Sequence, residues 1–344
     1  MPNTTIERQQ ALIWEYLKGF HATHLIGMGT QMGLWAELAD AKSGTSAVAL
    51  AEKLNLHAPY VEIWCRTAFA YRLIEATADG RYVMAPHMRE VLVDRSDPRH
   101  LGTYVATTVN HTTDDLRAYP EYFKTGGVKP FQVRGDDFTR HISDATAGFH
   151  SVVAKKLLPS APGLKEKFAG GARVLDIGCG TAGLLIKLAQ AWPKVTGVGV
   201  DIDPYGIAQA RANIAAAGVA KRIDVEAIGG EGMKYASEFD AATMFEVLHE
   251  IAPDRRESTV AAIHRALAPG GVLFIIDETY PSGFAELRDA AFAFAVQTQF
   301  NELAWGNIVP TREEQDRLFA GAGFAHVQRT LIAGLFTMIT AIKT

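Results

Sequence analysis

The segment Val174–Gly183, with the sequence Val-Leu-Asp-Ile-Gly-Cys-Gly-Thr-Ala-Gly, constrains the fold more than any other part of the chain. It begins as an apolar run with a β-branched residue, which is typical of a buried strand, and continues into a Gly-x-Gly-x-x-Gly pattern. The residues from Leu184 onward have the apolar pattern of a helix. A strand, a glycine turn and a helix let the backbone approach a nucleotide-like ligand closely. The segment therefore predicts an α/β domain with a ligand at this turn, and an ordinary tight turn is the alternative.

Two acidic residues narrow the choice of ligand. Asp176 precedes the glycines, where a carboxylate suits a cationic group such as an amino-acid ammonium and suits a pyrophosphate poorly. A second apolar strand ends at Asp201, where a carboxylate can accept hydrogen bonds from both ribose hydroxyls. The two stretches resemble the first two motifs of the class I S-adenosylmethionine-dependent methyltransferases. A dinucleotide-binding domain is the main alternative.

The resemblance implies the cofactor S-adenosyl-L-methionine and a set of residues that contact it. In this family the third strand commonly ends in Gly-Asp, but here Gly230 stands where the acid is expected. We therefore expect the backbone of Gly230 and the side chain of Met233 to serve the adenine. The implied cofactor-binding residues are Asp176, Gly178, Cys179, Gly180, Asp201, Ile202, Gly230, Met233 and Phe245.

Apolar strands and helical patterns alternate from Ala172 onward, which predicts a parallel sheet with helices on both faces. The expected strands are 174–177, 196–201, 223–228, 239–245 and 272–277, and the expected helices are 182–191, 203–217, 254–268 and 311–322. Residues 327–332 and 336–342 look like a final antiparallel pair, which separates a methyltransferase sheet from a plain nucleotide-binding one. The expected fold class is α/β, with a Rossmann-like seven-stranded methyltransferase sheet and a terminal antiparallel strand, preceded by a mainly α-helical domain.

In the N-terminal region, glycines interrupt a helical pattern over 11–38, which predicts two helices or close helix packing, and a helix, helix and hairpin follow over 45–84. The latter is a winged-helix pattern, in which residues 59–74 would form a DNA-reading helix. A groove-reading helix should be basic and polar on its outer face, whereas this segment is largely apolar. Residues 31–38 are similar to the opening of the dimerisation domain of two-domain small-molecule O-methyltransferases. We therefore expect a homodimer, with a winged-helix dimerisation domain over 1–95, substrate-covering helices over 96–170 and a cofactor-binding domain over 171–344.

Composition and charge exclude several classes of partner. The net charge of −4 gives no electrostatic reason to expect nucleic acid or an anionic membrane as a partner. No apolar run approaches the ~20 residues of a membrane span, and residues 1–10 lack a secretory signal pattern. We expect a cytoplasmic protein. No metal site is expected, because His21 and His24 lack a third ligand nearby.

His249 is the candidate catalytic residue. It follows the fourth expected strand, at the edge of the sheet where ligands of open α/β folds bind. In the two-domain O-methyltransferases that the chain resembles, a histidine at this place deprotonates the acceptor hydroxyl, and imidazole titrates near neutral pH. In methyltransferases of carbon acceptors, Val-Leu-His also occurs here and the histidine can be structural.

The carboxylates beside His249 are the second part of the expected site. Asp277 and Glu278 end the fifth strand, where the family carries its first flanking carboxylate to orient the histidine. The family's second flanking carboxylate is missing, because the corresponding positions read Val309-Pro310-Thr311. This departure leaves C- or N-methylation open beside methylation of a hydroxyl.

The expected acceptor is a small apolar or aromatic metabolite. The aromatic residues of 284–305 form either a core helix or a lid over that acceptor. Phe131, Phe138, His141, Phe149 and His150 are further candidates for the acceptor pocket. Two alternatives from other classes remain: a cofactor-binding winged-helix regulator, and an enzyme that uses the sulfonium without transferring its methyl group.

Overall fold

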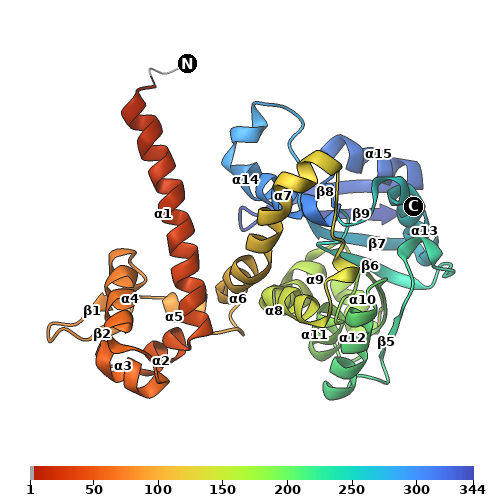
Figure 1. Ribbon diagram of the computed structural model, residues 1–344. Coiled ribbons are helices and arrows are strands. Elements are labelled where there is room, and N and C mark those ends of the chain that lie inside the picture. The colour runs from red at the N-terminus through yellow and green to blue at the C-terminus, as the bar shows by residue number, and fades with distance from the viewer. Residues whose placement is uncertain (1–3) are drawn as a thin grey trace. The chain divides into compact units, whose positions relative to one another are not determined.

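The chain, a computed structural model that describes residues 4–344, divides into two compact units (Figure 1). The first unit comprises Met1–Thr113 with Asp144–Gly148, and the second comprises Asp114–Ser143 with Phe149–Thr344. The expected division into three parts at residues 95 and 170 stays a prediction.

The first unit is mainly helical. Its long first helix α1 (Ile6–Gln31) and the short α2 (Leu34–Asp40) meet at Gly33, whose φ of 76° favours glycine. Gly29 lies inside α1, where a Cβ atom would lie 2.4 Å from the Trp35 indole nitrogen. The expected interruption by glycines therefore occurs only at Gly33, and Gly29 serves close packing. The remaining elements are α3 (Ala47–Leu54), α4 (Ala58–Ala70), β1 (Ile74–Ala76), β2 (Tyr82–Met84), α5 (Met88–Leu92) and α6 (Gly102–Thr107).

The helix, helix and hairpin expected over 45–84 are present as α3, α4, β1 and β2. The Ser46 side chain caps α3 by accepting from Ala49 N at 3.1 Å, and β1 and β2 pair antiparallel. The expectation that α4 continues to Ile74 is wrong. Arg72 has a φ of 62°, outside the helical region, and Ile74 opens β1 instead. The identification of this module as a winged helix stays a prediction.

The second unit contains a seven-stranded sheet in the order β5-β4-β3-β6-β7-β9-β8 (Figure 1). Strands β3 to β7 run parallel, while β9 is antiparallel to both β7 and β8. The expected terminal antiparallel pair is therefore confirmed. The strands are β3 (Arg173–Ile177), β4 (Thr196–Val200), β5 (Ile223–Glu226), β6 (Phe239–Phe245), β7 (Leu267–Asp277), β8 (Phe324–Ile332) and β9 (Phe336–Lys343).

Helices cover both faces of this sheet and form two separate apolar cores. One core includes Leu158, Leu185 and Ile207 of α9, α11 and α12 against the strands, and the other includes Val260 and Phe319 of α13 and α15. This three-layer arrangement buries β3 on both sides, so four of its five residues are buried and Asp176 is its one buried charged residue. The helices are α7 (Thr113–Thr125), α8 (Asp136–Val152), α9 (Leu158–Ser160), α10 (Leu164–Gly170), α11 (Gly183–Ala191), α12 (Pro204–Ala216), α13 (Pro253–Ala266), α14 (Ala293–Glu302) and α15 (Arg312–Ala322).

The carboxyl ends of β3, β4, β6 and β7 lie at one edge of the sheet, because these strands are parallel neighbours. Ligands of open α/β sheets bind at this edge. Among residues 4–344, no helix is both long and apolar enough to cross a membrane.

Candidate active site

The glycine turn after β3 is held by backbone hydrogen bonds to β4. Gly178 N and Cys179 N both donate to Val200 O, at 2.8 and 3.1 Å. Gly178 has a φ of 66°, and a Cβ atom there would lie 2.4 Å from Val247. Gly180 has a φ of 50° and open space where a Cβ would be. The turn therefore presents bare backbone, as the sequence predicts for a close approach by a ligand.

Asp201 closes this turn from the end of β4. Its carboxylate accepts from Gly180 N at 2.7 Å and from Asp203 N at 2.8 Å. Each carboxylate oxygen has a further lone pair, so the side chain can still accept from a ligand hydroxyl. The neighbouring Ile202 side chain is 55% exposed, which leaves it free to pack on a ligand.

Asp176, the last acidic residue of β3, is buried beside Thr243 of β6. The Thr243 hydroxyl donates to Asp176 Oδ1 at 2.5 Å, and the two residues are register partners in the sheet. Burial raises the pKa of Asp176 to about 7, with the Asp201 carboxylate adding to the rise and the Thr243 hydrogen bond opposing it. A cation bound here would favour the ionised form.

The three remaining candidate cofactor-binding residues lie in different surroundings. Gly230 lies where a Cβ would come within 2.7 Å of Thr259, so an acidic side chain has no room at this position without a shift of α13. Met233 is buried in the core on the α13 face. Phe245 is half-buried at the end of β6. Their roles toward the cofactor stay predictions.

His249 lies in the turn after β6 and is almost fully buried. Its Nδ1 atom lies 2.6 Å from Asp277 Oδ1 at the end of β7. Asp277 Oδ2 accepts from the backbone N–H groups of Leu248 and His249, at 2.7 and 3.3 Å, and Oδ1 also accepts from Glu278 N at 2.8 Å. The expected contact between His249 and Asp277 is therefore present, and it fixes the orientation of the ring.

The expectation that His249 lacks a second flanking carboxylate is wrong. Glu302, the last residue of α14, places Oε2 3.1 Å from His249 Nε2. Asn307 holds this carboxylate by donating from Nδ2 to Glu302 Oε2 at 2.8 Å. The carboxylate comes from the end of α14 and not from positions 309–311, which directly precede α15. The only signal in the sequence was an acidic residue at the end of an otherwise uncharged helical stretch.

The charge states of His249 and Asp277 follow from this geometry. Burial disfavours the imidazolium form of His249, but the Asp277, Glu302 and Glu278 carboxylates outweigh burial and raise its pKa well above the ordinary value. Burial likewise opposes ionisation of Asp277, while His249 and the N–H donors hold the pKa of Asp277 below the ordinary value. The expectation that His249 titrates near an ordinary histidine pKa is therefore wrong for this protein.

Glu278 is also buried beside the His249 ring, but its hydrogen bonds differ from those of Asp277. Its Oε1 accepts from the Thr298 hydroxyl of α14 at 3.0 Å, while Oε2 lies 3.3 Å from His249 Nδ1. Nδ1 already has the shorter contact to Asp277, and Glu278 Oε2 has no hydrogen-bond partner within residues 4–344. Burial raises the pKa of Glu278 well above the ordinary value, with nearby carboxylates adding to the rise and His249 opposing it. Glu278 therefore favours the protonated form.

The segment 284–305 brings Thr298 and Glu302, one helical turn apart on α14, to this cluster. It is less regular than expected, because short 3-10 turns at Glu286–Arg288 and Ala290–Phe292 precede α14. Tyr119 of α7 donates its hydroxyl to the carbonyl groups of Phe300 and Asn301, the two residues before Glu302. The helix end that carries Glu302 is thus fixed by a side chain far away in the sequence.

A buried ion pair anchors the chain just beyond Glu302. Arg134 Nη1 lies 2.7 Å from Asp115 Oδ2, and the Trp305 indole N–H donates to the same oxygen at 2.9 Å. Phe131 and Phe138 pack edge-on against Trp305. These two phenylalanines, expected as candidates for the acceptor pocket, therefore belong to this packed cluster.

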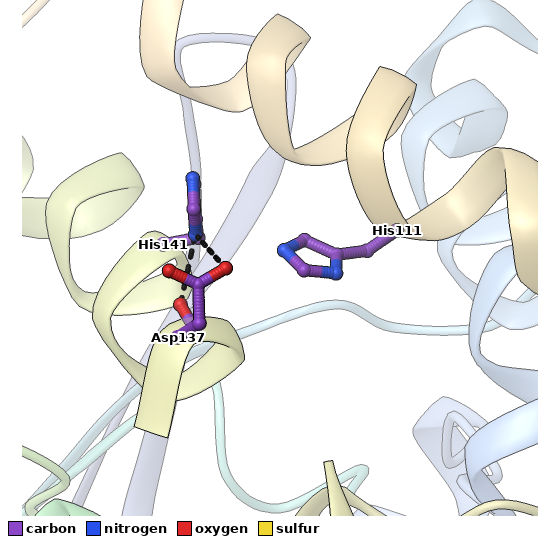
Figure 2. A group of neighbouring side chains, drawn as sticks. All are labelled: His111, Asp137 and His141. Carbon is purple, nitrogen blue, oxygen red and sulfur yellow. Dashed lines mark hydrogen bonds and ion pairs between the residues drawn. The ribbon is translucent and has the colours of Figure 1, made fainter. Parts of the chain in front are cut away.

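Other expected pocket residues lie apart from that cluster. Phe149 and His150 pack edge-on against Phe245, with ring centroids 5.5 and 4.6 Å away. His141 faces Asp137 one turn earlier on α8, with Nδ1 3.4 Å from Asp137 Oδ2 (Figure 2). Phe149 and His150 thus adjoin the expected ligand edge, whereas the His141 ring is paired within its own helix.

The arrangement of these residues fits a nucleoside that carries a cationic amino-acid group. The bare backbone of Gly178 and Gly180, the remaining lone pairs of Asp201 and the buried Asp176 carboxylate are the groups that such a ligand needs. Ligand atoms of His249, Glu250 and Glu302 also lie within 4.8 Å of one another, a spacing that a metal ion could use. The hydrogen bonds of His249 account for its arrangement without one.

Comparisons with known proteins find methyltransferases. A family model described as a methyltransferase domain matches residues 174–271. A relative from Synechocystis sp., described as an uncharacterized methyltransferase, is 30% identical over 164 residues, covering 48% of this chain and 72% of the relative. A second relative, the 3-hydroxy-5-methyl-1-naphthoate 3-O-methyltransferase of Streptomyces sahachiroi, is 26% identical over 271 residues, covering 77% of this chain and 76% of the relative.

Solved structures share the whole fold. Human N-acetylserotonin methyltransferase, solved with S-adenosylmethionine, has a TM-score of 0.81 at 16% identity, covering 100% of this chain and 99% of that one. A putative O-methyltransferase from Nostoc punctiforme has a TM-score of 0.77 at 20% identity, covering 97% and 98%. The fold and the glycine turn are thus those of the class I methyltransferases. The chain belongs to the methyltransferase family, and it is an enzyme that uses S-adenosyl-L-methionine.

Proposed function

We propose that this enzyme methylates a hydroxyl group of a small apolar or aromatic metabolite, with His249 as the general base. The observation that carries the proposal is the placement of the His249 ring between two carboxylates, Asp277 on Nδ1 and Glu302 on Nε2. This arrangement supports hydroxyl over carbon acceptors, because a hydroxyl needs a base whereas a purely structural histidine needs no carboxylate at its outer nitrogen. The Streptomyces relative, named as a 3-O-methyltransferase of a naphthoate, lends support.

The cofactor supplies an electrophilic methyl group on a sulfonium, so the protein has to orient the acceptor and remove its proton. In this proposal Asp176 binds the amino group of the cofactor, and Asp201, aided by Ile202, binds its ribose and adenine. The backbone of Gly178, Cys179, Gly180 and Gly230 forms the cradle, with Met233 and Phe245 at its sides. Orientation of the two reactants supplies roughly 7–11 kcal/mol of the barrier reduction in favourable cases.

The proton path runs through the His249 ring. His249 Nδ1 donates to Asp277, which fixes Nε2 as the atom that accepts the proton of the hydroxyl. The acceptor hydroxyl approaches Nε2 beside Glu302, and the Glu302 carboxylate, 3.1 Å from Nε2, stabilises the imidazolium that forms. Glu278 remains protonated and fills the space behind the ring.

The test is formation of S-adenosylhomocysteine from S-adenosylmethionine and simple hydroxyarenes, with mass spectrometry of the methylated product. A methyl ether in stoichiometric yield with S-adenosylhomocysteine supports the proposal. Methylation only at carbon or nitrogen would contradict it. Consumption of the cofactor without S-adenosylhomocysteine would point to use of the sulfonium without methyl transfer.

We further propose a homodimer formed through residues 1–95. The outer surface of α1 carries large apolar side chains that are mostly more than 40% exposed, more than a monomer normally leaves uncovered. They are Ile6, Leu12, Ile13, Trp14, Tyr16, Leu17 and Phe20. Tyr60, Ile63 and Phe69 add exposed apolar surface on α4, which suits a protein partner better than DNA. Light scattering at micromolar concentration should give twice the mass of the chain, and a monomer would contradict this proposal.

A further inference from the structure

Carboxylates surround the His249 ring on several sides. Asp277, Glu278 and Glu302 each place an oxygen within 3.3 Å of a ring nitrogen. A carboxylate oxygen of Glu250, the next residue in the chain, lies within 4.8 Å of the relevant atoms of His249 and Glu302. Together with Glu246, which follows β6, these residues form what we call the acidic cluster.

Few cations offset the acidic cluster. Within residues 4–344, its carboxylates form ion pairs with His249 alone, and none pairs with a lysine or an arginine. Arg256 is buried nearby, but Nη1 pairs with Glu314, and its other nitrogens donate to backbone carbonyls, including His249 O at 3.4 Å and Ile251 O at 2.9 Å. The positive charge of Arg256 is therefore already matched by a carboxylate outside the cluster.

Burial and neighbouring carboxylates both disfavour negative charge on Glu246 and Glu278 of the cluster. Burial raises the pKa of Glu246 to about 8, with the Glu302 and Asp277 carboxylates adding to the rise and His249 opposing it. Glu278 is shifted upward as well, mainly by its burial. These two carboxyl groups therefore hold their protons more tightly than usual, although His249 is close to both. An anionic group brought to this place would meet the same opposition.

A group of phenylalanines lies at the same edge of the sheet. Phe336 opens β9, and the next residue, Thr337, is the register partner of Asp277. The Phe336 ring stacks on Phe149 at a centroid distance of 5.4 Å and meets Phe294 edge-on at 5.0 Å. Phe149 in turn contacts Phe245, the residue before Glu246. Half-buried aromatic rings therefore adjoin the acidic cluster.

From this juxtaposition we propose that the acceptor is an aromatic compound that is neutral or positively charged near its reacting hydroxyl, and that aryl carboxylates are rejected. The inference rests on the proposed function and adds charge selection to it. Phenylalanine rings bind the flat face of an arene and attract cations, while the acidic cluster repels an anion. A naphthoate, for which the Streptomyces relative is named, should therefore be a poor acceptor for this enzyme.

The test uses three naphthols that differ in one substituent. They are 3-hydroxy-1-naphthoic acid, its methyl ester, and the same ring with an aminomethyl group in place of the carboxylate. Affinity is measured by calorimetry with the full chain saturated with S-adenosylhomocysteine, and turnover by formation of that product from S-adenosylmethionine. We expect the ester and the amine to exceed the acid at least tenfold in affinity and in kcat/KM at pH 7.5. Equal or better binding of the acid overturns the inference, and so does failure of all three to bind.

Two charge-reversal variants test whether the acidic cluster causes the preference for the ester over the acid. Glu250→Lys places a cation beside His249 and should narrow the ratio of ester to acid at least threefold. Glu257→Lys makes the same change in net charge at an exposed position of α13 and should leave the ratio unchanged. An unchanged ratio in Glu250→Lys, or an equal change in both variants, contradicts the role of the cluster. Methyl transfer to the acid as readily as to the ester would leave the proposed function intact, so the two failures are distinguishable.

Discussion

The cofactor side of the site, residues 176–203, and the acceptor side, built around His249, are held by different kinds of contact. Asp201 binds backbone N–H groups of Gly180 and Asp203, 21 and 2 residues away in the sequence. His249 is held by side chains 28 and 53 residues away, on β7 and α14. Apart from the contact of Asp176 with Thr243, the cofactor side is therefore held within one strand–helix–strand segment, whereas the acceptor side depends on side chains from several distant elements.

The difference predicts two separable kinds of defect. A change on the cofactor side should reduce affinity for S-adenosylhomocysteine. A change on the acceptor side should reduce turnover or move its pH dependence, with the cofactor still bound. A single variant that lost both cofactor affinity and turnover would contradict this separation of the two sides.

The largest effect is expected for His249→Ala. Loss of one positioned acid–base group typically lowers turnover about 10²–10⁴-fold. Affinity for S-adenosylhomocysteine should stay within about threefold, because in the proposed mechanism the imidazole faces the acceptor. Steady-state kinetics and calorimetry on the same preparation check both numbers. Turnover within about threefold of the wild type would make His249 structural, with catalysis mainly by orientation.

Gly178→Val should have the largest effect on the cofactor side. Its Cβ would lie 2.4 Å from Val247 at a φ of 66°, so the turn has to move. We expect affinity for S-adenosylhomocysteine to fall by at least about a hundredfold, because the cradle depends on this backbone. Gly218→Val is the control, since Gly218 has a similar φ of 68° but open space and lies outside the site. Equal loss of affinity in both variants would show that backbone strain alone is responsible.

Asp277→Asn tests whether the acceptor side also stabilises the fold. The side-chain oxygens accept three backbone N–H groups as well as His249 Nδ1, and an amide NH₂ would face one of these donors. We expect a loss of unfolding free energy of about 1–3 kcal/mol and a smaller loss of turnover than for His249→Ala. Denaturant titration measures the loss of unfolding free energy, and steady-state kinetics measures the loss of turnover. Full stability in this variant would contradict the hydrogen-bond pattern of Asp277.

The smallest effect concerns Asp176. Because its pKa is raised to about 7, the carboxylate gains a proton as pH falls through that value, and its attraction for the cofactor amino group is then lost. Affinity for S-adenosylhomocysteine should fall about tenfold between pH 8 and pH 6, as the ionised fraction falls. Asp176→Asn should bind weakly and without this dependence. A pH-independent wild type would remove Asp176 from the binding of that group.

The sequence was sufficient for the parts of the molecule that depend on neighbours along the chain. The strand, the glycine turn around Gly178, Asp201 and the terminal antiparallel pair lie as expected, because turn geometry and apolar periodicity are local. His249 and Asp277 also meet as expected, because both follow neighbouring parallel strands.

Glu302 and the pKa of His249 could not be predicted in the same way. The position of Glu302 depends on how α14 packs, which is fixed by Tyr119 and by the ion pair of Asp115 far away in the sequence. Burial lowers the pKa of His249, and Asp277, Glu302 and Glu278 together raise it above the ordinary value; of these carboxylates, Glu302 is not visible in the residues around the histidine.

The pH dependence of turnover in the wild type and in Glu302→Gln tests the central claim most directly. Neutral imidazole is the base, and the flanking carboxylates raise the pKa of His249, so the wild-type rate should rise with pH through an apparent pKa above that of an ordinary histidine. Removal of one carboxylate at hydrogen-bond distance should move this rise to lower pH by about 1–3 units. His249→Ala should lose the rise altogether. A rise in rate that stays at the same pH in Glu302→Gln, or that persists in His249→Ala, would contradict the roles proposed for His249 and Glu302.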